Sequence, residues 1–177
     1  MTIQVNGTTG IDTIQDNTVS SSKIVNGAVT PADTQVGALP SSIIVVTGNG
    51  NGSTNTFVKR FTTTLLSQGS DVTYTASATN GDTFTINTSG TYAVSYSDAY
   101  TIVADLTITA NGVTLTINPG NINDITRVTV CDSPASAVGC CSASRYFSAG
   151  TVIRAQNSSG TQLASGIYAQ FTITRVA

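Results

Sequence analysis

The alternation of apolar and polar residues in short runs, from Ser42 to the end of the chain, most constrains the fold. In Thr91–Ser97 the even positions carry Tyr92, Val94 and Tyr96, while the odd positions carry Thr, Ala or Ser. A period of two places all three apolar side chains on one face of a β-strand. Gly, Asn, Asp and Ser separate such runs along the chain, and these residues favour turns. The pattern predicts half-buried strands that pack through one face.

About ten short strands with frequent turns are expected, which is typical of a two-sheet jelly-roll sandwich. The pair Asn111-Gly112 is the strongest hairpin signal, so residues 105–110 and 113–117 are expected to pair across it. The expected segments are 42–47, 57–65, 72–76, 83–87, 91–97, 105–110, 113–117, 125–130, 145–147, 152–155 and 167–173. Phe57, Lys59 and Phe61 fall on one face of the second segment. The fold class is therefore predicted to be all-β.

Composition agrees with this class and narrows the partners. The chain has 31 Thr and 20 Ser but no Glu, His or Trp, and the straight-chain helix formers Glu, Lys, Gln and Arg are scarce. Only 9% of the residues are charged and the net charge is −2, which predicts no binding to nucleic acid or to an anionic membrane. No window reaches the roughly 18 apolar residues of a membrane span, and the start of the chain lacks a signal-peptide pattern. We expect synthesis and assembly in a cytoplasm.

Residues 1–40 differ from the rest because they contain three ten-residue units in register, Asn6–Gln15, Asp16–Val25 and Asn26–Gln35. Each unit opens with a turn pair and has little to bury alone, so it needs a partner surface. We predict an extended N-terminal anchoring arm over 1–40 and a jelly-roll domain over 41–177; the alternative is a poorly ordered tail. The candidate docking residues of the arm are Ile11, Ile14, Val19, Ile24, Val25, Val29 and Pro31.

The three cysteines lie together in Cys131–Cys141, a segment expected to be a loop. Without a histidine, three thiols do not complete the usual four-ligand zinc site in one chain. Two interpretations remain open: unpaired thiols on a loop, or a disulfide from Cys131 to Cys140 or Cys141 after release into an oxidising medium.

The residues do not assemble a catalytic set, so we expect no enzyme and no cofactor. A serine triad needs an imidazole or an equivalent base, and the chain has no His. The nine Asp residues stand mostly beside turn residues, where local backbone hydrogen bonds explain them. The oxygens of Asn121, Asn123 and Asp124 could bind calcium, but a turn is favoured there. The glycines of Gly48–Gly52 lack the lysine of a phosphate-binding loop.

Four segments in order resemble the complement globular-head and tumour-necrosis-factor-like jelly rolls. They are Asp82–Tyr96, the stretch around Asn111-Gly112, Tyr146–Gln156 and Ser165–Ile173. In the third, Thr151 stands where the family usually has aspartate. The resemblance covers residues 55–177 and implies a ten-stranded jelly roll that assembles as a homotrimer.

The resemblance also implies that aromatic residues of the first, central and closing strands pack between subunits. The candidates for this trimer interface are Phe57, Phe61, Tyr92, Tyr96, Tyr168 and Phe171. The alternative is that these side chains fill the core of their own subunit.

The decapeptide units resemble the short repeats of bacteriophage fibre, tail and head-decoration proteins. This resemblance implies a virion protein on the capsid surface whose arm binds the major capsid protein or other virion subunits. Three units are too few for a long shaft, which favours a trimeric decoration, or cement, protein that stabilises the head. The alternative is a short fibre or receptor-binding tip that binds host glycans through Ser, Thr, Asn and Tyr side chains.

Overall fold

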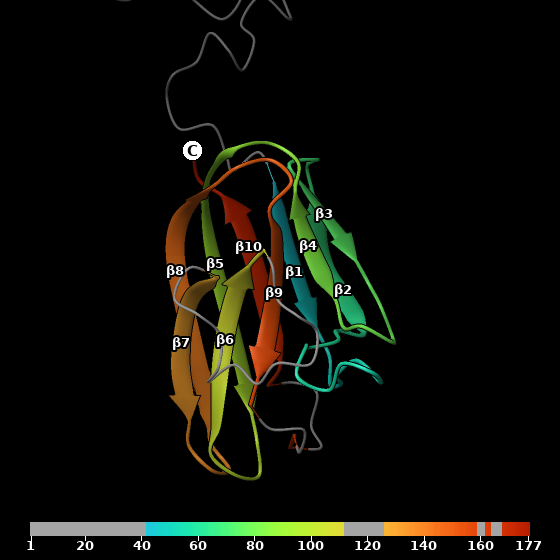
Figure 1. Ribbon diagram of the computed structural model, residues 1–177, viewed down its shortest axis with the longest axis vertical. Coiled ribbons are helices and arrows are strands. Elements are labelled where there is room, and N and C mark those ends of the chain that lie inside the picture. The colour runs from blue at the N-terminus through green and yellow to red at the C-terminus, as the bar shows by residue number, and fades with distance from the viewer. Residues whose placement is uncertain (1–41, 112–125, 159–161, 164–167) are drawn as a thin grey trace, which may run out of the picture. The chain divides into compact units, whose positions relative to one another are not determined.

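The computed structural model describes residues 42–111, 126–158, 162–163 and 168–177, and they form a two-layer all-β sandwich (Figure 1). One antiparallel sheet has the strand order β2-β1-β10-β5-β8, and the other has the order β3-β4-β9-β6-β7. Strands from distant parts of the sequence lie side by side in both sheets, as in a jelly roll. The all-β, two-sheet prediction is confirmed for the described residues.

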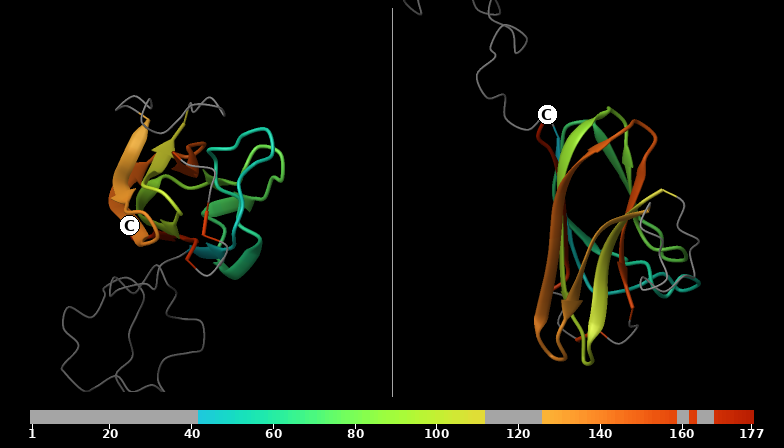
Figure 2. Two further views of the ribbon diagram at one scale, coloured as in Figure 1. Left: turned by 90° about the horizontal axis from the view of Figure 1, so that it is seen from below. Right: turned by 60° about the vertical axis from the view of Figure 1, so that its left-hand side comes forward.

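Ten strands make up the two sheets in this part of the chain. They are β1 (Ile43–Thr47), β2 (Thr63–Gln68), β3 (Val72–Thr75), β4 (Thr83–Ile86), β5 (Gly90–Ala99), β6 (Ala104–Ala110), β7 (Arg127–Ser133), β8 (Val138–Phe147), β9 (Val152–Asn157) and β10 (Gln170–Arg175). The views in Figure 2 show the two layers facing each other.

The period of two buries one face of each central strand. On β5 the side chains of Tyr92, Val94 and Tyr96 are buried and the residues between them are half-buried. On β10 Phe171 and Ile173 alternate with outward-facing threonines in the same way. The inward residues of both sheets meet in one core, because each sheet has an apolar face that only the other can cover.

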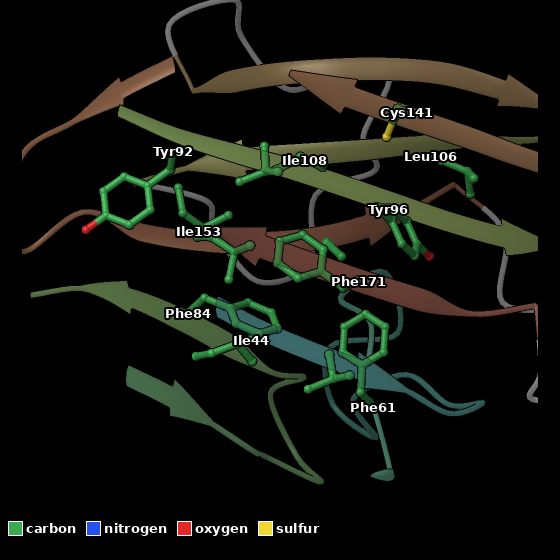
Figure 3. Close-up of a cluster of buried hydrophobic side chains, with 14 of the residues drawn as sticks. Ile44, Phe61, Phe84, Tyr92, Tyr96, Leu106, Ile108, Cys141, Ile153 and Phe171 are labelled. Atoms are coloured by element: carbon green, nitrogen blue, oxygen red, sulfur yellow. The ribbon is translucent and has the colours of Figure 1, made fainter. Parts of the chain in front are cut away.

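Aromatic rings occupy the centre of this core (Figure 3). The ring of Phe171 stacks on that of Phe84, with centroids 4.3 Å apart. Phe61 lies edge-on to Phe84 and to Tyr96, with centroid distances of 6.3 and 6.4 Å. These offset and edge-to-face arrangements are the favourable geometries of aromatic pairs. Through these contacts β10 packs directly against β4 of the other sheet, and Phe61 packs between β5 and β4.

One sequence prediction about strands is wrong. The second predicted strand, 57–65, is a regular strand only from Thr63, because Val58 and Lys59 form isolated bridges to Gln156 and Asn51 instead. The predicted partner of 105–110 across Asn111-Gly112 was 113–117, which lies outside the described residues. Among the described strands, β6 pairs with β7 along one edge and with β9 along the other.

The described part of the chain contains no helix long and apolar enough to cross a membrane. The predicted arm over 1–40 also lies outside the described residues, with its docking residues, so the division at residue 40 stays a prediction.

Candidate functional site

Four of the six predicted trimer-interface residues are core residues of the protomer, which corrects that prediction. Phe61, Tyr92, Tyr96 and Phe171 are at most 3% exposed. A side chain enclosed by its own subunit cannot contact a neighbour. The alternative interpretation, that they fill the core, is therefore correct for these four.

The remaining two predicted interface residues are accessible. Phe57 is half-buried, and its carbonyl accepts a hydrogen bond from the backbone of Asn157. Tyr168 is exposed, and its carbonyl accepts a hydrogen bond from the Ser97 hydroxyl. Their role between subunits stays a prediction.

The outward side of the β2-β1-β10-β5-β8 sheet is the best candidate for a binding surface. The inter-strand register aligns its outward residues in three rows that cross all five strands. We call these fifteen residues the uncharged face: Leu66, Val45, Thr172, Ser95 and Ser142; Gln68, Ile43, Thr174, Ala93 and Ser144; Thr63, Thr47, Gln170, Ser97 and Cys140.

Small side chains make the middle of the uncharged face shallowly concave. Ala93, Ser95, Ser142, Ser144, Thr172 and Thr174 line a depression of about 340 Å³. Its floor is backbone and short side chains, which permit another chain to approach closely. The hydroxyl groups can exchange water for partners at little cost, since they are neutral.

None of the fifteen residues of the uncharged face carries a charge. Interface cores are depleted of charged residues because desolvating a charge is costly. The rim adds apolar area: every residue of the edge strand β2 is exposed, with Leu66 42% and Leu65 58% exposed. An open edge strand with exposed leucines favours association. The face therefore has the chemistry of a protein–protein contact surface.

This assignment is tested by replacing Ser95 with Arg. For the homotrimer that the sequence predicts, we expect Ser95→Arg to separate the subunits, because the interface would have to desolvate three guanidinium groups. The measurement is the mass in solution by light scattering, relative to the chain mass of 18.1 kDa.

Thr85→Arg is the matched control, because Thr85 is a half-buried outward residue of β4 in the other sheet. We expect it to keep the mass of the wild-type assembly. Both variants should keep the circular dichroism of the wild type. A Ser95→Arg variant with the wild-type mass would show that the subunits do not associate through this face.

A buried polar cluster lies behind the uncharged face, and the sequence did not predict it. The Lys59 ammonium donates to Asp98 Oδ2 at 2.7 Å, and neither side chain is more than 3% exposed. The phenols of Tyr96 and Tyr100 donate to the same oxygen at 3.0 and 2.8 Å, and Gln162 does so at 3.3 Å. Several donors thus compensate one buried carboxylate, which is the condition for tolerating it.

The pKa shifts in this cluster indicate that it stabilises the fold. Burial lowers the pKa of Lys59 although the charge of Asp98 and its hydrogen bond oppose the shift. Burial also raises the pKa of Tyr96 and Tyr100, so both phenols stay protonated and donate to the carboxylate. One feature of the sequence indicated that Lys59 is buried: in the alternating pattern it falls on the same face as Phe57 and Phe61, and the Phe61 side chain is in the core.

A second polar contact explains the position of Phe61. Asp82 is 1% exposed, and its Oδ2 accepts the Phe61 backbone N–H at 2.6 Å and the Tyr74 phenol at 2.6 Å. Its Oδ1 accepts the Ser77 backbone N–H at 2.8 Å. Asp82 therefore follows the predicted role of binding nearby backbone. Asp98 does so through Oδ1, which accepts the Ala99 backbone N–H at 2.9 Å, while its Oδ2 binds Lys59 and the two phenols.

The three cysteines lie on strands and not on a loop, which corrects the prediction for them; the connection itself is limited to residues 134–137. Cys131 lies on β7, and Cys140 and Cys141 lie on β8. All three are free thiols; Cys140 is exposed, Cys131 is half-buried and Cys141 is buried.

The candidate calcium oxygens at 121–124 lie outside the described residues. Within the residues that the structure describes, no group of three or more His, Cys, Asp or Glu side chains could hold a metal ion.

The strand order and the two facing sheets define a TNF-like jelly roll, and solved structures agree. The fold is similar to that of murine APRIL in crystals at pH 8.5, with a TM-score of 0.55 and 11% identity. A second crystal structure, at pH 8.0, gives a TM-score of 0.52 and 13% identity. Each alignment covers 76% of this chain and 98% of murine APRIL. No protein-family model and no curated protein sequence matches the chain.

Proposed function

We propose that this chain is a homotrimeric structural protein of a bacteriophage particle, which decorates the capsid and is anchored by residues 1–40. The observation that carries the trimer is the uncharged face, a broad surface without a charged side chain on a TNF-like jelly roll. The subunits associate through this face, and Tyr168 lies beside it because its carbonyl accepts a hydrogen bond from Ser97 of the face.

The role on the capsid follows from the arm. Its three units carry isolated apolar residues that need a partner surface, and their register resembles that of head-decoration repeats. Three arms from one trimer would bind neighbouring capsid subunits at a site of threefold or quasi-threefold symmetry. The trimer then ties those subunits together by burial, as a cement protein does, and acts by binding rather than by catalysis.

Removing residues 1–40 tests this proposal. We expect the shortened chain to fold and to form the same trimer, because the uncharged face is intact, but to lose binding to particles that lack the protein. The measurement is co-sedimentation with such particles, with the full chain as the control. Loss of the trimer on truncation would show that the arm, not the jelly roll, determines assembly.

The cement role also predicts how stable particles without the protein are. Particles without the protein should release their DNA at lower temperature or milder osmotic shock than complete particles. Equal resistance would contradict cementing. Glycan binding by the isolated trimer, with loss of adsorption on deletion, would instead favour the receptor-binding alternative.

A further inference from the structure

Two of the three thiols lie where the edges of the two sheets meet. Cys131 is on β7, the edge strand of one sheet, and Cys141 is on β8, the edge strand of the other. The Cys141 side chain points between the sheets toward the core (Figure 3). Cys131 is half-buried and packs against the same core. Both sulfurs therefore occupy the space between the two edges.

The two cysteines also lie at matching positions of β7 and β8. A Cβ on Gly139 would lie 2.7 Å from the Cβ of Ser133 and 2.8 Å from its Cα, so these two residues are side by side. Because the chain doubles back through the short connection 134–137, Cys131 and Cys141, each two residues further from that connection, lie opposite each other. The Cys140 side chain points the other way: it is exposed and belongs to the uncharged face, in register with Ser97. Because neighbouring residues of a strand face opposite sides, only one of the adjacent cysteines can face Cys131.

We propose that Cys131 and Cys141 form a disulfide site that fastens β7 to β8, with Cys140 left as the free thiol. A low-molecular-weight disulfide, such as glutathione disulfide, is the oxidant. One thiolate attacks it and expels a glutathione thiol; the second thiolate attacks the mixed disulfide and expels another. The two protein sulfurs lose two electrons and two protons, and the glutathione disulfide gains them.

The bond would close one side of the sandwich. Among the described strands, β7 has β6 as its one sheet neighbour and β8 has β5, so β7 and β8 are joined by the short connection between them and by side-chain packing. A covalent bond here restricts the unfolded chain and links the two sheets. Burial raises the pKa of both thiols, so the reaction needs mildly alkaline conditions to proceed at a useful rate. The inference does not rest on the proposed function.

The test oxidises the full folded chain with glutathione disulfide and follows intact mass after alkylation of the remaining thiols. Peptide mapping separates adjacent cysteines poorly, so Cys→Ser variants identify the pair. Wild type and Cys140→Ser should lose about 2 Da, the two thiol hydrogens. Cys140→Ser should react at least tenfold faster than Cys141→Ser, and Cys131→Ser should form no intramolecular bond. Oxidised Cys140→Ser should melt roughly 5–10 °C higher than its reduced form.

Repeating the reaction in denaturant separates folding from sequence proximity. In the unfolded chain Cys140 and Cys141 are almost equally near Cys131 along the sequence, so the two single variants should react at similar rates. A native Cys141→Ser variant that forms the bond as fast as Cys140→Ser would overturn the assignment. Alkylation of all three thiols of the native chain after oxidation would overturn it as well.

Discussion

Replacing Asp98 with Ala is expected to lower the free energy of unfolding by about 3–5 kcal/mol, as for other buried ion pairs that lose one partner. Lys59 is fully buried, and its Nζ donates a hydrogen bond to the Asp98 carboxylate at 2.7 Å. In the variant this buried ammonium group would have lost its carboxylate partner. The phenols of Tyr96 and Tyr100 would lose the same acceptor. Urea denaturation of the variant and the wild type measures the difference.

Two further substitutions make this result specific. Arg60→Ala removes the exposed neighbouring cation and should change stability by no more than about 0.5 kcal/mol. The double variant Lys59→Met with Asp98→Asn removes both charges and keeps an acceptor for the phenols, so it should recover at least half of the loss. A small effect of Asp98→Ala would mean that the lysine is not enclosed.

The pH dependence of the same variant provides an independent check. Burial lowers the pKa of Lys59 in the folded chain below its ordinary value of 10.5. At pH values between the folded pKa and 10.5, the unfolded chain therefore binds more protons than the folded chain. Stability contributed by this group therefore rises with pH in that window. Without the opposing charge of Asp98 the folded pKa falls further, and the stability of Asp98→Ala should rise more steeply with pH than that of the wild type.

Replacing Phe171 with Ala is the second large effect, with an expected loss of about 3–5 kcal/mol. The Phe171 ring is fully buried, stacks on Phe84 and lies 6.1 Å from the Phe61 ring. Removing it leaves a cavity where β10 of one sheet faces β4 of the other, and the packed strands close such a cavity only in part. The measurement is again urea denaturation.

Tyr146→Ala is the matched control, since Tyr146 is an aromatic residue of β8 that is 62% exposed. Its loss should cost no more than about 0.5 kcal/mol. A cost below about 1 kcal/mol for Phe171→Ala would contradict the central position of β10.

Local pattern predicted the strands well because half-buried strands obey a strict period of two. Tyr92, Val94 and Tyr96 were assigned to one face of a strand, and that face is buried on β5. The pattern could not tell burial inside a subunit from burial between subunits, since both favour aromatic side chains. That is why Tyr92 and Phe171 were wrongly assigned to the trimer interface.

The uncharged face had a weaker signal, because Ser, Thr and Ala are also typical of exposed strands and turns. Its residues come from five strands that are far apart in sequence, and only the register brings Val45, Thr172, Ser95 and Ser142 into one row. The prediction that the cysteines lie on a loop was wrong for a related reason. The Pro, Ala, Ser and Gly residues between the cysteines suggest a loop. In the structure, β7 and β8 pack against the core and extend into this segment from both ends, so that only 134–137 lies between them.

By itself, the sequence determined that this chain builds an all-β sandwich, because alternation and turn residues act locally and need no knowledge of neighbours. The folded chain alone shows which strands are adjacent, that Lys59 meets Asp98, that Cys141 rather than Cys140 points into the core that Cys131 packs against, and which sheet presents an uncharged surface. These outcomes depend on contacts between residues distant in sequence, whose pairing is set by packing the whole core at once.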